Sequence, residues 1–315
     1  MSDVFAVDLG GTKCSAAVVD RSGCIVSRRT VAVDLSSPNA PVLQIIQLAK
    51  QFAARHPLKR AFLAAGVAVP GLVRPSGTVW APNLPGWERM PLASRLKRSL
   101  GIPVVVESDR NAAIVGECWR GAARGKTDAI VFMIGTGIGA GILSGGRVLR
   151  GAHELSGCAG WLTITQAKRA PTDGIGELEW LAAGPAIARA AQERLAAGEI
   201  SSLSHIDLSR ITAHEVAEAA RKADHLAVEI FRHVGDLLGC GIANMVSLLD
   251  PQVIVLGGGL AAVADLYLDS LRSAMLERAQ PLSAAQVKVV VSRLGDKANL
   301  LGCARLAWDH AGKRF

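Results

Sequence analysis

An apolar run followed by a glycine-containing turn occurs twice in this chain, and each turn leads into a second apolar run. The first run, Phe5 to Leu9, precedes Gly10-Gly11, and the second, Ala129 to Ile134, precedes a turn that begins at Gly135. An apolar run, a tight turn and another apolar run are typical of two antiparallel strands. The pattern therefore predicts an internal duplication, although the letters of the two copies differ.

The remaining pattern indicates that helices and strands alternate. The first three apolar segments, 4–8, 14–20 and 24–33, predict an antiparallel meander. Further on, the sequence predicts helices over 40–55, 111–120 and 224–249, and buried strands over 62–69, 104–106 and 253–256. A chain of 315 residues, half of them apolar, is long enough to form two domains of this α/β kind.

Charge and cysteine usage limit the partners and the compartment. The net charge is +8, but the positive residues are spread along the chain, which favours a solvated basic surface over nucleic-acid binding. The six cysteines form no Cys-x-x-Cys pair, which favours free thiols in a reducing compartment. The first strand begins too early for a signal peptide, and the longest apolar stretch contains four glycines. We therefore expect a cytoplasmic protein that binds neither nucleic acid nor membranes.

Three glycine turns stand directly after apolar strands, and together they indicate a nucleotide site. Gly10 to Lys13, Gly135 to Gly141 and Gly257 to Gly259 are these turns. Glycine lets backbone N–H groups approach a phosphate closely, and Thr12 and Lys13 can add a hydroxyl group and a charge. The Gly10-Gly11 turn alone also fits an ordinary hairpin, and any one of the three turns is weak evidence. The carboxylate of Asp8, at a strand end, can hold magnesium directly or through water.

A fourth feature is the carboxylate of Asp109, which follows a short buried strand and precedes a helix. Aspartate is a favourable N-cap residue, so helix capping is one interpretation. The other is a general base that takes the proton of an attacking hydroxyl group during phosphoryl transfer. The sequence leaves both interpretations open.

These segments together resemble the ROK family of sugar kinases and repressors, in the actin-like ATPase superfamily. The resemblance rests on Asp8 to Lys13, Ser108 to Ala113, Gly135 to Gly139 and Gly257 to Gly259, and it covers essentially the whole chain. It implies an α/β fold of two actin-like, ribonuclease H-like domains with a cleft between them. We expect a small domain of residues 1–107 plus about 298–315, and a large domain of residues 108–297.

The resemblance also implies the roles of individual residues. Asp109 matches the catalytic base, and Asp8 would face a magnesium ion. The implied contacts to ATP are Gly10, Gly11, Thr12, Lys13, Gly135, Thr136, Gly137 and Gly139 for the phosphates, and Gly257, Gly258 and Gly259 for adenosine. The candidate acceptor contacts are Asn83, Ser108, Asp109, His153, Glu154, Cys158, Trp161 and Glu179. Family members also suggest a homodimer.

The chain departs from the family on the acceptor side. Cys158 and Trp161 stand where sugar-phosphorylating members carry Glu and His, and residues 165–180 contain none of the cysteines of the family's zinc segment. We therefore expect no zinc site, with packing by Trp161 and Trp180 in its place, and weaker recognition of glucose-type hydroxyl groups. Trp161 is expected either to stack on a sugar face or to fill the core. A structural role for His153 also remains open.

The sequence thus predicts an ATP-dependent kinase acting on a hexose, an amino sugar or a polyol. The alternative is a non-catalytic sensor of sugar or nucleotide with the same fold. A helix-turn-helix, which precedes the first phosphate strand in the family's repressors, is not expected, because that strand begins at about residue 4. An actin-like structural ATPase is disfavoured by the residues around Asp109.

Overall fold

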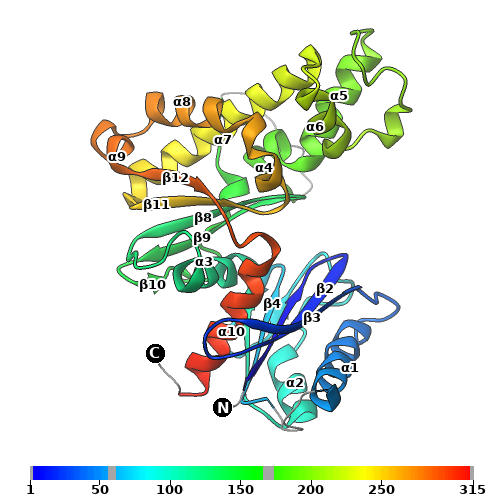
Figure 1. The fold of residues 1–315 in the computed structure, drawn as a ribbon, viewed down its shortest axis with the longest axis vertical. Helices are drawn as coiled ribbons and strands as arrows, with labels where there is room; N and C mark the ends of the chain where they lie inside the picture. Colours follow the sequence, from blue (N-terminus) through cyan, green and yellow to red (C-terminus); the bar gives the residue numbers. More distant parts are fainter. Residues whose placement is uncertain (1–2, 56–61, 166–173, 313–315) are drawn as a thin grey trace. The chain divides into compact units, whose positions relative to one another are not determined.

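The computed structural model describes residues 3–55, 62–165 and 174–312, and the chain divides into two compact units. Unit 1 comprises Met1–Gly125, Val148–Ser156 and Asp296–Phe315, and unit 2 comprises Lys126–Arg147 and Gly157–Gly295. Each unit contains a five-stranded sheet of mixed direction with helices packed on it (Figure 1). The predicted α/β class with two domains is confirmed.

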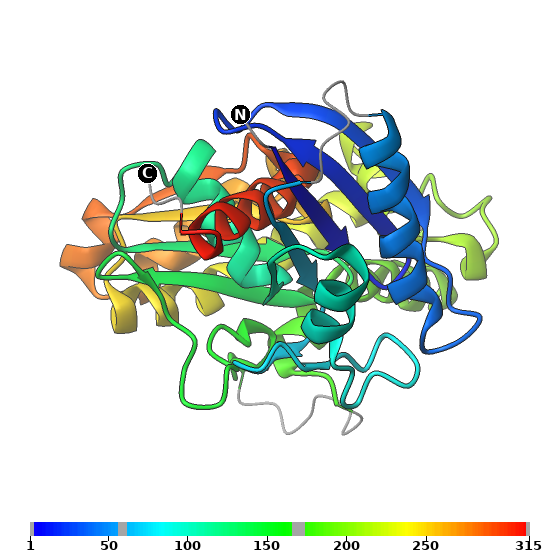
Figure 2. The same ribbon diagram turned by 90° about the horizontal axis from the view of Figure 1, so that it is seen from below.

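Unit 1 is built on the sheet β3-β2-β1-β4-β7. Strands β1 to β3 form the antiparallel meander, and β1, β4 and β7 run parallel. Helices α1 and α2 lie on one face of the sheet, and α3 and α10 lie on the other (Figures 1 and 2). Its elements are β1 (Val4–Leu9), β2 (Lys13–Val19), β3 (Ile25–Ala32), α1 (Ala40–Arg55), β4 (Ala65–Val69), β5 (Leu72–Val73), β6 (Val79–Trp80), α2 (Leu92–Leu100), β7 (Val104–Ser108), α3 (Asp109–Arg120) and α10 (Ala298–His310).

Unit 2 repeats this order in the sheet β10-β9-β8-β11-β12, with β8 and β9 antiparallel and β8, β11 and β12 parallel. Helix α7 carries the longest apolar stripe and packs along α8. The elements are β8 (Ala129–Ile134), β9 (Ile138–Ser144), β10 (Arg147–Val148), α4 (Glu177–Ala182), α5 (Gly184–Ala196), α6 (Ala213–Arg221), α7 (His225–Leu249), β11 (Val253–Gly257), α8 (Leu268–Arg278), α9 (Pro281–Gln286) and β12 (Lys288–Val291). The short 3-10 helices are η1 (Ala159–Trp161), η2 (Leu208–Arg210), η3 (Gly259–Leu266) and η4 (Gly295–Lys297). In the sequence, η4 spans the point where the chain passes from unit 2 to unit 1.

Close backbone contacts fix α10 on unit 1. A Cβ atom on Gly302 would lie 1.8 Å from the carbonyl oxygen of Ala112 in α3, and one on Gly66 in β4 would lie 2.0 Å from that of Cys303. Only glycine permits such an approach, because any side chain would overlap the facing backbone. The C-terminal helix is therefore packed between α3 and the parallel strands.

The two units are divided differently from the predicted domains. Residues 108–125 and 148–156 belong to unit 1, whereas the sequence placed them in the second domain. The reason is the packing of α3 against α10, together with side-chain bonds that hold residues 148–156 to the start of α3. The domain boundaries themselves stay a prediction, and residues 313–315 of the predicted small domain lie outside the described residues.

Individual elements follow the predictions with small shifts. The strand predicted over 62–69 is shorter and spans Ala65–Val69. Helix α7 begins after Asp224, whose side chain accepts a hydrogen bond from the backbone N–H of Ala227, and it ends before Asp250. No helix in the described part of the chain is long and apolar enough to cross a membrane.

Candidate functional site

Two carboxylates lie at the carboxyl ends of the parallel strands of unit 1. Asp8 is paired with Ala68 of β4, and Ala68 is paired with Glu107 of β7, so all three residues stand at one level of the sheet. Asp109 follows β7 directly as the first residue of α3. Ligand sites of open α/β sheets form at this edge, because the loops that follow parallel strands meet there.

Burial changes the acidity of both carboxylates. Desolvation raises the pKa of Asp8 from 3.8 to about 6, a hydrogen bond from Asn299 opposes this rise, and the negative charge of Asp109 adds to it. Asn299 Nδ2 donates this bond to Asp8 Oδ1 over 3.1 Å. Desolvation also raises the pKa of Asp109, against the backbone N–H and the charge of Arg110. Both groups therefore bind a proton or a cation more readily than an exposed aspartate does.

Asp109 is not the N-cap residue of α3, so the interpretation that it caps the helix is wrong. The N-cap residue of α3 is Ser108, and Asp109 Oδ1 accepts a hydrogen bond from the N–H of Arg110 over 2.7 Å. Ser108 is 2% exposed, and its hydroxyl oxygen has no hydrogen-bond partner among the described residues. The carboxylate of Asp109 thus interacts with the backbone N–H groups of Arg110 and of Asp109 itself, which leaves acceptor capacity for a substrate proton.

The first glycine turn and Asn83 lie side by side in unit 1. The N–H of Gly10 donates to the carbonyl of Lys13 over 2.9 Å, which closes the turn, and Thr12 and Lys13 are exposed. A Cβ atom on Gly11 would lie 3.7 Å from Cβ of Asn83. The loop that carries Asn83 is anchored by the buried Trp87, whose indole N–H donates to the carbonyl of Pro38.

The other two glycine turns share one pocket in unit 2. Gly258 has a φ of +82°, and a Cβ atom there would lie 2.4 Å from the carbonyl oxygen of Ile134, so this turn requires glycine. A Cβ atom on Gly135 would lie 3.7 Å from the nitrogen of Gly259, which brings the two turns together. The pocket has a volume of about 440 Å³, and its lining comprises Gly135, Thr136, Gly184, Pro185, Ala188, Ile211, Thr212, Ala213, His214, Gly259 and Leu260.

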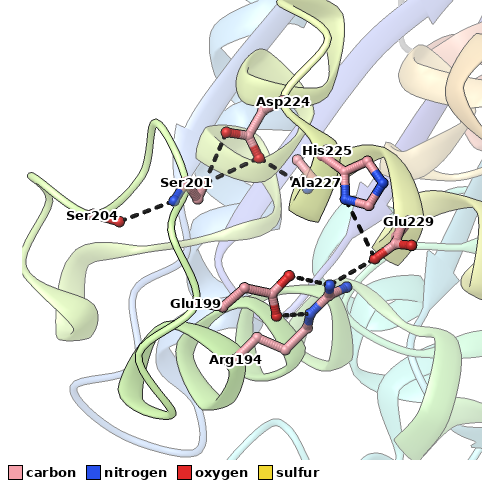
Figure 3. Close-up of polar contacts among 8 residues, drawn as sticks. All are labelled: Arg194, Glu199, Ser201, Ser204, Asp224, His225, Ala227 and Glu229. Atoms are coloured by element: carbon pink, nitrogen blue, oxygen red, sulfur yellow. Dashed lines mark hydrogen bonds and ion pairs between the residues drawn. The ribbon is translucent and has the colours of Figure 1, made fainter.

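A polar network holds the segment that leads to this pocket (Figure 3). Arg194 of α5 binds Glu199, and its Nη2 lies 2.7 Å from Glu229 Oε2 of α7. Asp224 accepts hydrogen bonds from the hydroxyl group of Ser201 and the N–H of Ala227. The segment after α5 is thereby tied to α7 before it reaches the pocket wall at Ile211 and Thr212.

Glu179 braces the second glycine turn. Its Oε2 accepts a hydrogen bond from the N–H of Ile138 over 2.7 Å, and a Cβ atom on Gly137 would lie 2.7 Å from the same oxygen. The resemblance implied an acceptor contact for Glu179, and the structure adds this bond beside the turn. Gly139, on β9 next to Ile138, pairs with Met133 of β8.

The segment with Cys158 and Trp161 is fixed by its backbone. Gly157 has a φ of +83°, and its carbonyl accepts a hydrogen bond from the N–H of Ala140 over 2.7 Å. Cys158 is a half-buried free thiol. Trp161 is 61% exposed, so the expectation that it fills the core is wrong.

Glu177 holds Ile164 and Thr165, at the start of the segment that Trp161 and Trp180 were expected to hold by packing. One carboxylate oxygen, Oε1, accepts bonds from the N–H groups of Ile164 and Thr165 and from the hydroxyl group of Thr165, at 2.8 to 3.1 Å. Trp180 instead packs under the guanidinium group of Arg189, 3.4 Å from the ring centre. Among the described residues no three His, Cys, Asp or Glu side chains form a metal cluster, and residues 166–173 of the predicted zinc-free segment lie outside them.

His153 and Glu154 belong to unit 1. His153 is exposed, whereas the carboxylate of Glu154 lies 3.7 Å from the guanidinium group of Arg150. Sequence reasoning missed Asn299 and Arg110, because an asparagine in a helix and an arginine beside a carboxylate give no signal of their own. It also missed Thr212 to His214, where Thr212 and Glu215 form a capping box that marks only a helix start.

Comparison with known proteins gives one consistent family. The sequence model of the ROK family matches residues 4–310. The glucokinase of Halalkalibacterium halodurans is 30% identical over 312 residues, which cover 96% of this chain and 94% of that protein.

Two solved structures are also similar. A ROK family glucokinase from Streptomyces griseus, in complex with glucose and AMPPNP, has a TM-score of 0.81 and 32% identity, covering 98% of this chain and 100% of that chain. A ROK family transcriptional regulator, a homologue of the E. coli MLC protein, has a TM-score of 0.88 and 26% identity, covering 99% of this chain and 78% of that chain.

The hydrogen bond from Ile138 to Glu179 predicts that two substitutions of Glu179 lower the free energy of unfolding by different amounts. Glu179→Ala leaves the N–H of Ile138 without its acceptor and should lower the free energy of unfolding by about 1–3 kcal/mol. Glu179→Gln retains an acceptor oxygen and should lose less than half of that. Urea denaturation of both variants measures this. Equal stability of the two variants would show that the bond to Ile138 does not support the turn.

The raised pKa of Asp8 predicts that the free energy of unfolding depends on pH. Between pH 3.8 and about 6 the folded state keeps a proton that the unfolded chain has released, so the free energy of unfolding falls as pH rises through this window. Asp8→Asn removes the titration and should be more stable than the parent at pH 8 by about 2–3 kcal/mol, since each unit of raised pKa corresponds to about 1.4 kcal/mol. The difference should disappear below pH 3.8. Denaturation without divalent cations measures both values, and a constant difference across this range would contradict the prediction.

Proposed function

Because the chain belongs to the ROK family, we propose that it is an ATP-dependent kinase that phosphorylates a hydroxyl group of a sugar or sugar-like acceptor. The observation that carries this proposal is the placement of Asp109: a carboxylate with a raised pKa, at the carboxyl edge of parallel strands, beside a second carboxylate, Asp8. A purely structural aspartate gains nothing from this environment, since the desolvation of both carboxylates outweighs the charges of Arg110 and Arg28 and costs stability.

In the proposed reaction Asp109 accepts the proton of the acceptor hydroxyl group. The hydroxyl oxygen then forms a bond to the γ-phosphorus of ATP, and the bond from that phosphorus to the bridging oxygen breaks to release ADP. A carboxylate with a raised pKa is a better base for this step than an ordinary one. The proton leaves Asp109 to solvent before the next cycle.

The nucleotide contacts follow the glycine turns. We assign the turn from Gly10 to Lys13 and the turn from Gly135 to Gly139 to the phosphates, because their backbone N–H groups and the charge of Lys13 suit an anion. We assign adenosine to the pocket at Gly257 to Gly259, whose volume and mostly apolar lining suit a nucleoside. Use of ATP agrees with the AMPPNP bound in the similar Streptomyces griseus glucokinase.

Asp8 fits a magnesium ion. Its carboxylate is buried beside another negative charge, and the buried Oδ1 of its partner Asn299 has no hydrogen-bond partner among the described residues. A cation and its water ligands would satisfy both groups, as magnesium sites built from one or two carboxylates do. Magnesium bound to ATP neutralises charge on the phosphates, and Asp8 would hold it there.

On the acceptor side we propose contacts from Asn83, Ser108, Cys158 and the exposed ring of Trp161. An exposed indole offers a flat apolar face for a sugar ring, and a thiol offers only a weak hydrogen bond. This chemistry favours an acceptor with fewer recognised hydroxyl groups or with an apolar substituent, such as an acetylated amino sugar, over glucose. His153 remains a candidate contact because it is exposed.

The second candidate function is a non-catalytic sensor of sugar or nucleotide. It is favoured by the similarity to the ROK family transcriptional regulator. We also propose that the protein acts in the cytoplasm and forms a homodimer. Three exposed leucines on neighbouring helices of unit 2, Leu248 of α7, Leu276 of α8 and Leu282 of α9, are the candidate contact.

Asp109→Asn tests the kinase against the sensor. The proposal expects ATP consumption with one acceptor from a panel of hexoses, amino sugars and polyols, and a loss of about 10³-fold or more in kcat for this variant, because no base remains. ATP affinity should change little. Asp269→Asn, an exposed carboxylate on α8, is the matched control and should keep full activity. ATP binding without turnover on any acceptor would favour the sensor.

Leu282→Arg tests the dimer. The substitution places a charge at one of the three exposed leucines and should convert a dimer into a monomer at micromolar concentration, since an unpaired buried charge opposes association. Light scattering reports the mass, and Leu43→Arg is the control, at a leucine of unit 1 that is 63% exposed against 72% for Leu282. A monomeric parent protein, or a dimer that both variants retain, would contradict this interface.

A further inference from the structure

Arg110 links the start of α3 to the loop of unit 1 formed by Val148–Ser156. Its Nε donates to the carbonyl oxygen of Ser156 over 3.1 Å, and its Nη2 donates to the carbonyl oxygen of Glu154 over 3.2 Å. The same residue donates its backbone N–H to Asp109 Oδ1. Arg110 therefore contacts the proposed base through its backbone N–H, and its side chain contacts two carbonyl groups that lie more than forty residues further along the chain.

A second arginine fixes the other end of the loop. Arg150 Nη2 lies 2.5 Å from Oε2 of Glu107, which is 3% exposed. The other oxygen of Glu107 accepts bonds from the N–H of Ser108, at 2.8 Å, and from the side-chain amide of Asn111, at 3.0 Å. A buried carboxylate needs such partners, so the loop and the strand end that precedes Asp109 depend on each other.

The loop is held in a backbone conformation that it would not adopt freely. Glu154 has a φ of +61°, which costs a side-chain-bearing residue about 1–2 kcal/mol. Its carbonyl oxygen is bound by Arg110, and its carboxylate faces Arg150. The carbonyl and carboxylate groups of Glu154 thus face Arg110 and Arg150, while its neighbours His153 and Leu155 remain exposed.

We propose that Arg110 is a positioning residue for the acceptor. Arg110 fixes the loop from Gly151 to Ser156 against the start of α3. Acceptor binding therefore depends on Arg110, and ATP binding does not. The proposal rests on the proposed kinase function and deepens it on the acceptor side. It also accounts for arginine at this position. A guanidinium group can donate to two carbonyl groups at once in a fixed geometry, and a lysine ammonium group cannot hold both in the same way.

A purely structural role makes a different prediction. An arginine that only stabilises unit 1 would change the melting temperature and leave the Michaelis constants of the folded enzyme alone. A positioning role changes the KM of the acceptor and spares that of ATP. The two roles therefore separate in kinetics, provided that the variants are compared as folded protein.

The experiment compares Arg110→Ala, Arg110→Lys and Arg110→Gln with Arg147→Ala, an exposed arginine three residues before Arg150. Hydrogen exchange without ligands reports on the loop, in particular on the N–H of Ser156, which donates to the carbonyl of Arg150. Steady-state kinetics then gives KM for the acceptor and for ATP. Arg110→Gln, which keeps one donor and much of the length, serves if Arg110→Ala does not fold.

We expect faster exchange at Ser156 in Arg110→Ala and in Arg110→Lys, and no change in Arg147→Ala. The acceptor KM should rise about tenfold or more, which corresponds to about 1.4 kcal/mol, while the KM of ATP stays within about twofold. Unchanged exchange in Arg110→Ala overturns the proposal, as does full restoration by lysine or an equal rise in both KM values. The exchange measurement needs no acceptor, so failure of the kinase proposal is distinguishable from failure of this one.

Discussion

Desolvation of two neighbouring carboxylates is the constraint on which unit 1 depends. Asp8 and Asp109 reach the same sheet edge because β1, β4 and β7 are parallel and in register, and burial raises the pKa of both. Helix α10 contributes to this environment directly, since its close packing on β4 and α3 places Asn299 against Asp8. Helix α10 therefore contributes Asn299 to the same site to which strand β1 contributes Asp8.

The same sheet order supports different chemistry in the two units. In unit 1 the first strand ends near Asp8, and in unit 2 the matching strand β8 runs through Met133 and Ile134 into a glycine turn without an acidic residue. Unit 2 instead has a pocket lined by glycine turns. In these turns backbone segments lie close together, as at Gly258, where a Cβ atom would overlap the carbonyl oxygen of Ile134. A duplicated scaffold thus offers carboxylates in one copy and an apolar, backbone-lined pocket in the other.

The sequence predicted what is local and missed what depends on register and packing. The strands, the glycine turns and helix α7 carry their own periodicity and breakers, so their positions are confirmed within a few residues. The bond between Asp8 and Asn299 joins residues 291 positions apart, and nothing in either segment indicates it. The exposure of Trp161 and the three bonds to Glu177 depend in the same way on how the chain packs around α4.

The backbone around Cys158 and Trp161, the two positions that we propose contact the acceptor, is held independently of their side chains. The segment is placed by backbone contacts, from Gly157 to Ala140 and from Gly176 to Gly160, which do not involve these side chains. Under the proposed assignment, changes at these positions alter acceptor recognition at little cost to the fold. The pair of Asp8 and Asp109 behaves in the opposite way, because its burial costs stability in the ligand-free protein. A chain that keeps a costly pair of carboxylates is more simply understood as the kinase that we propose, with a different acceptor, than as a sensor without catalysis.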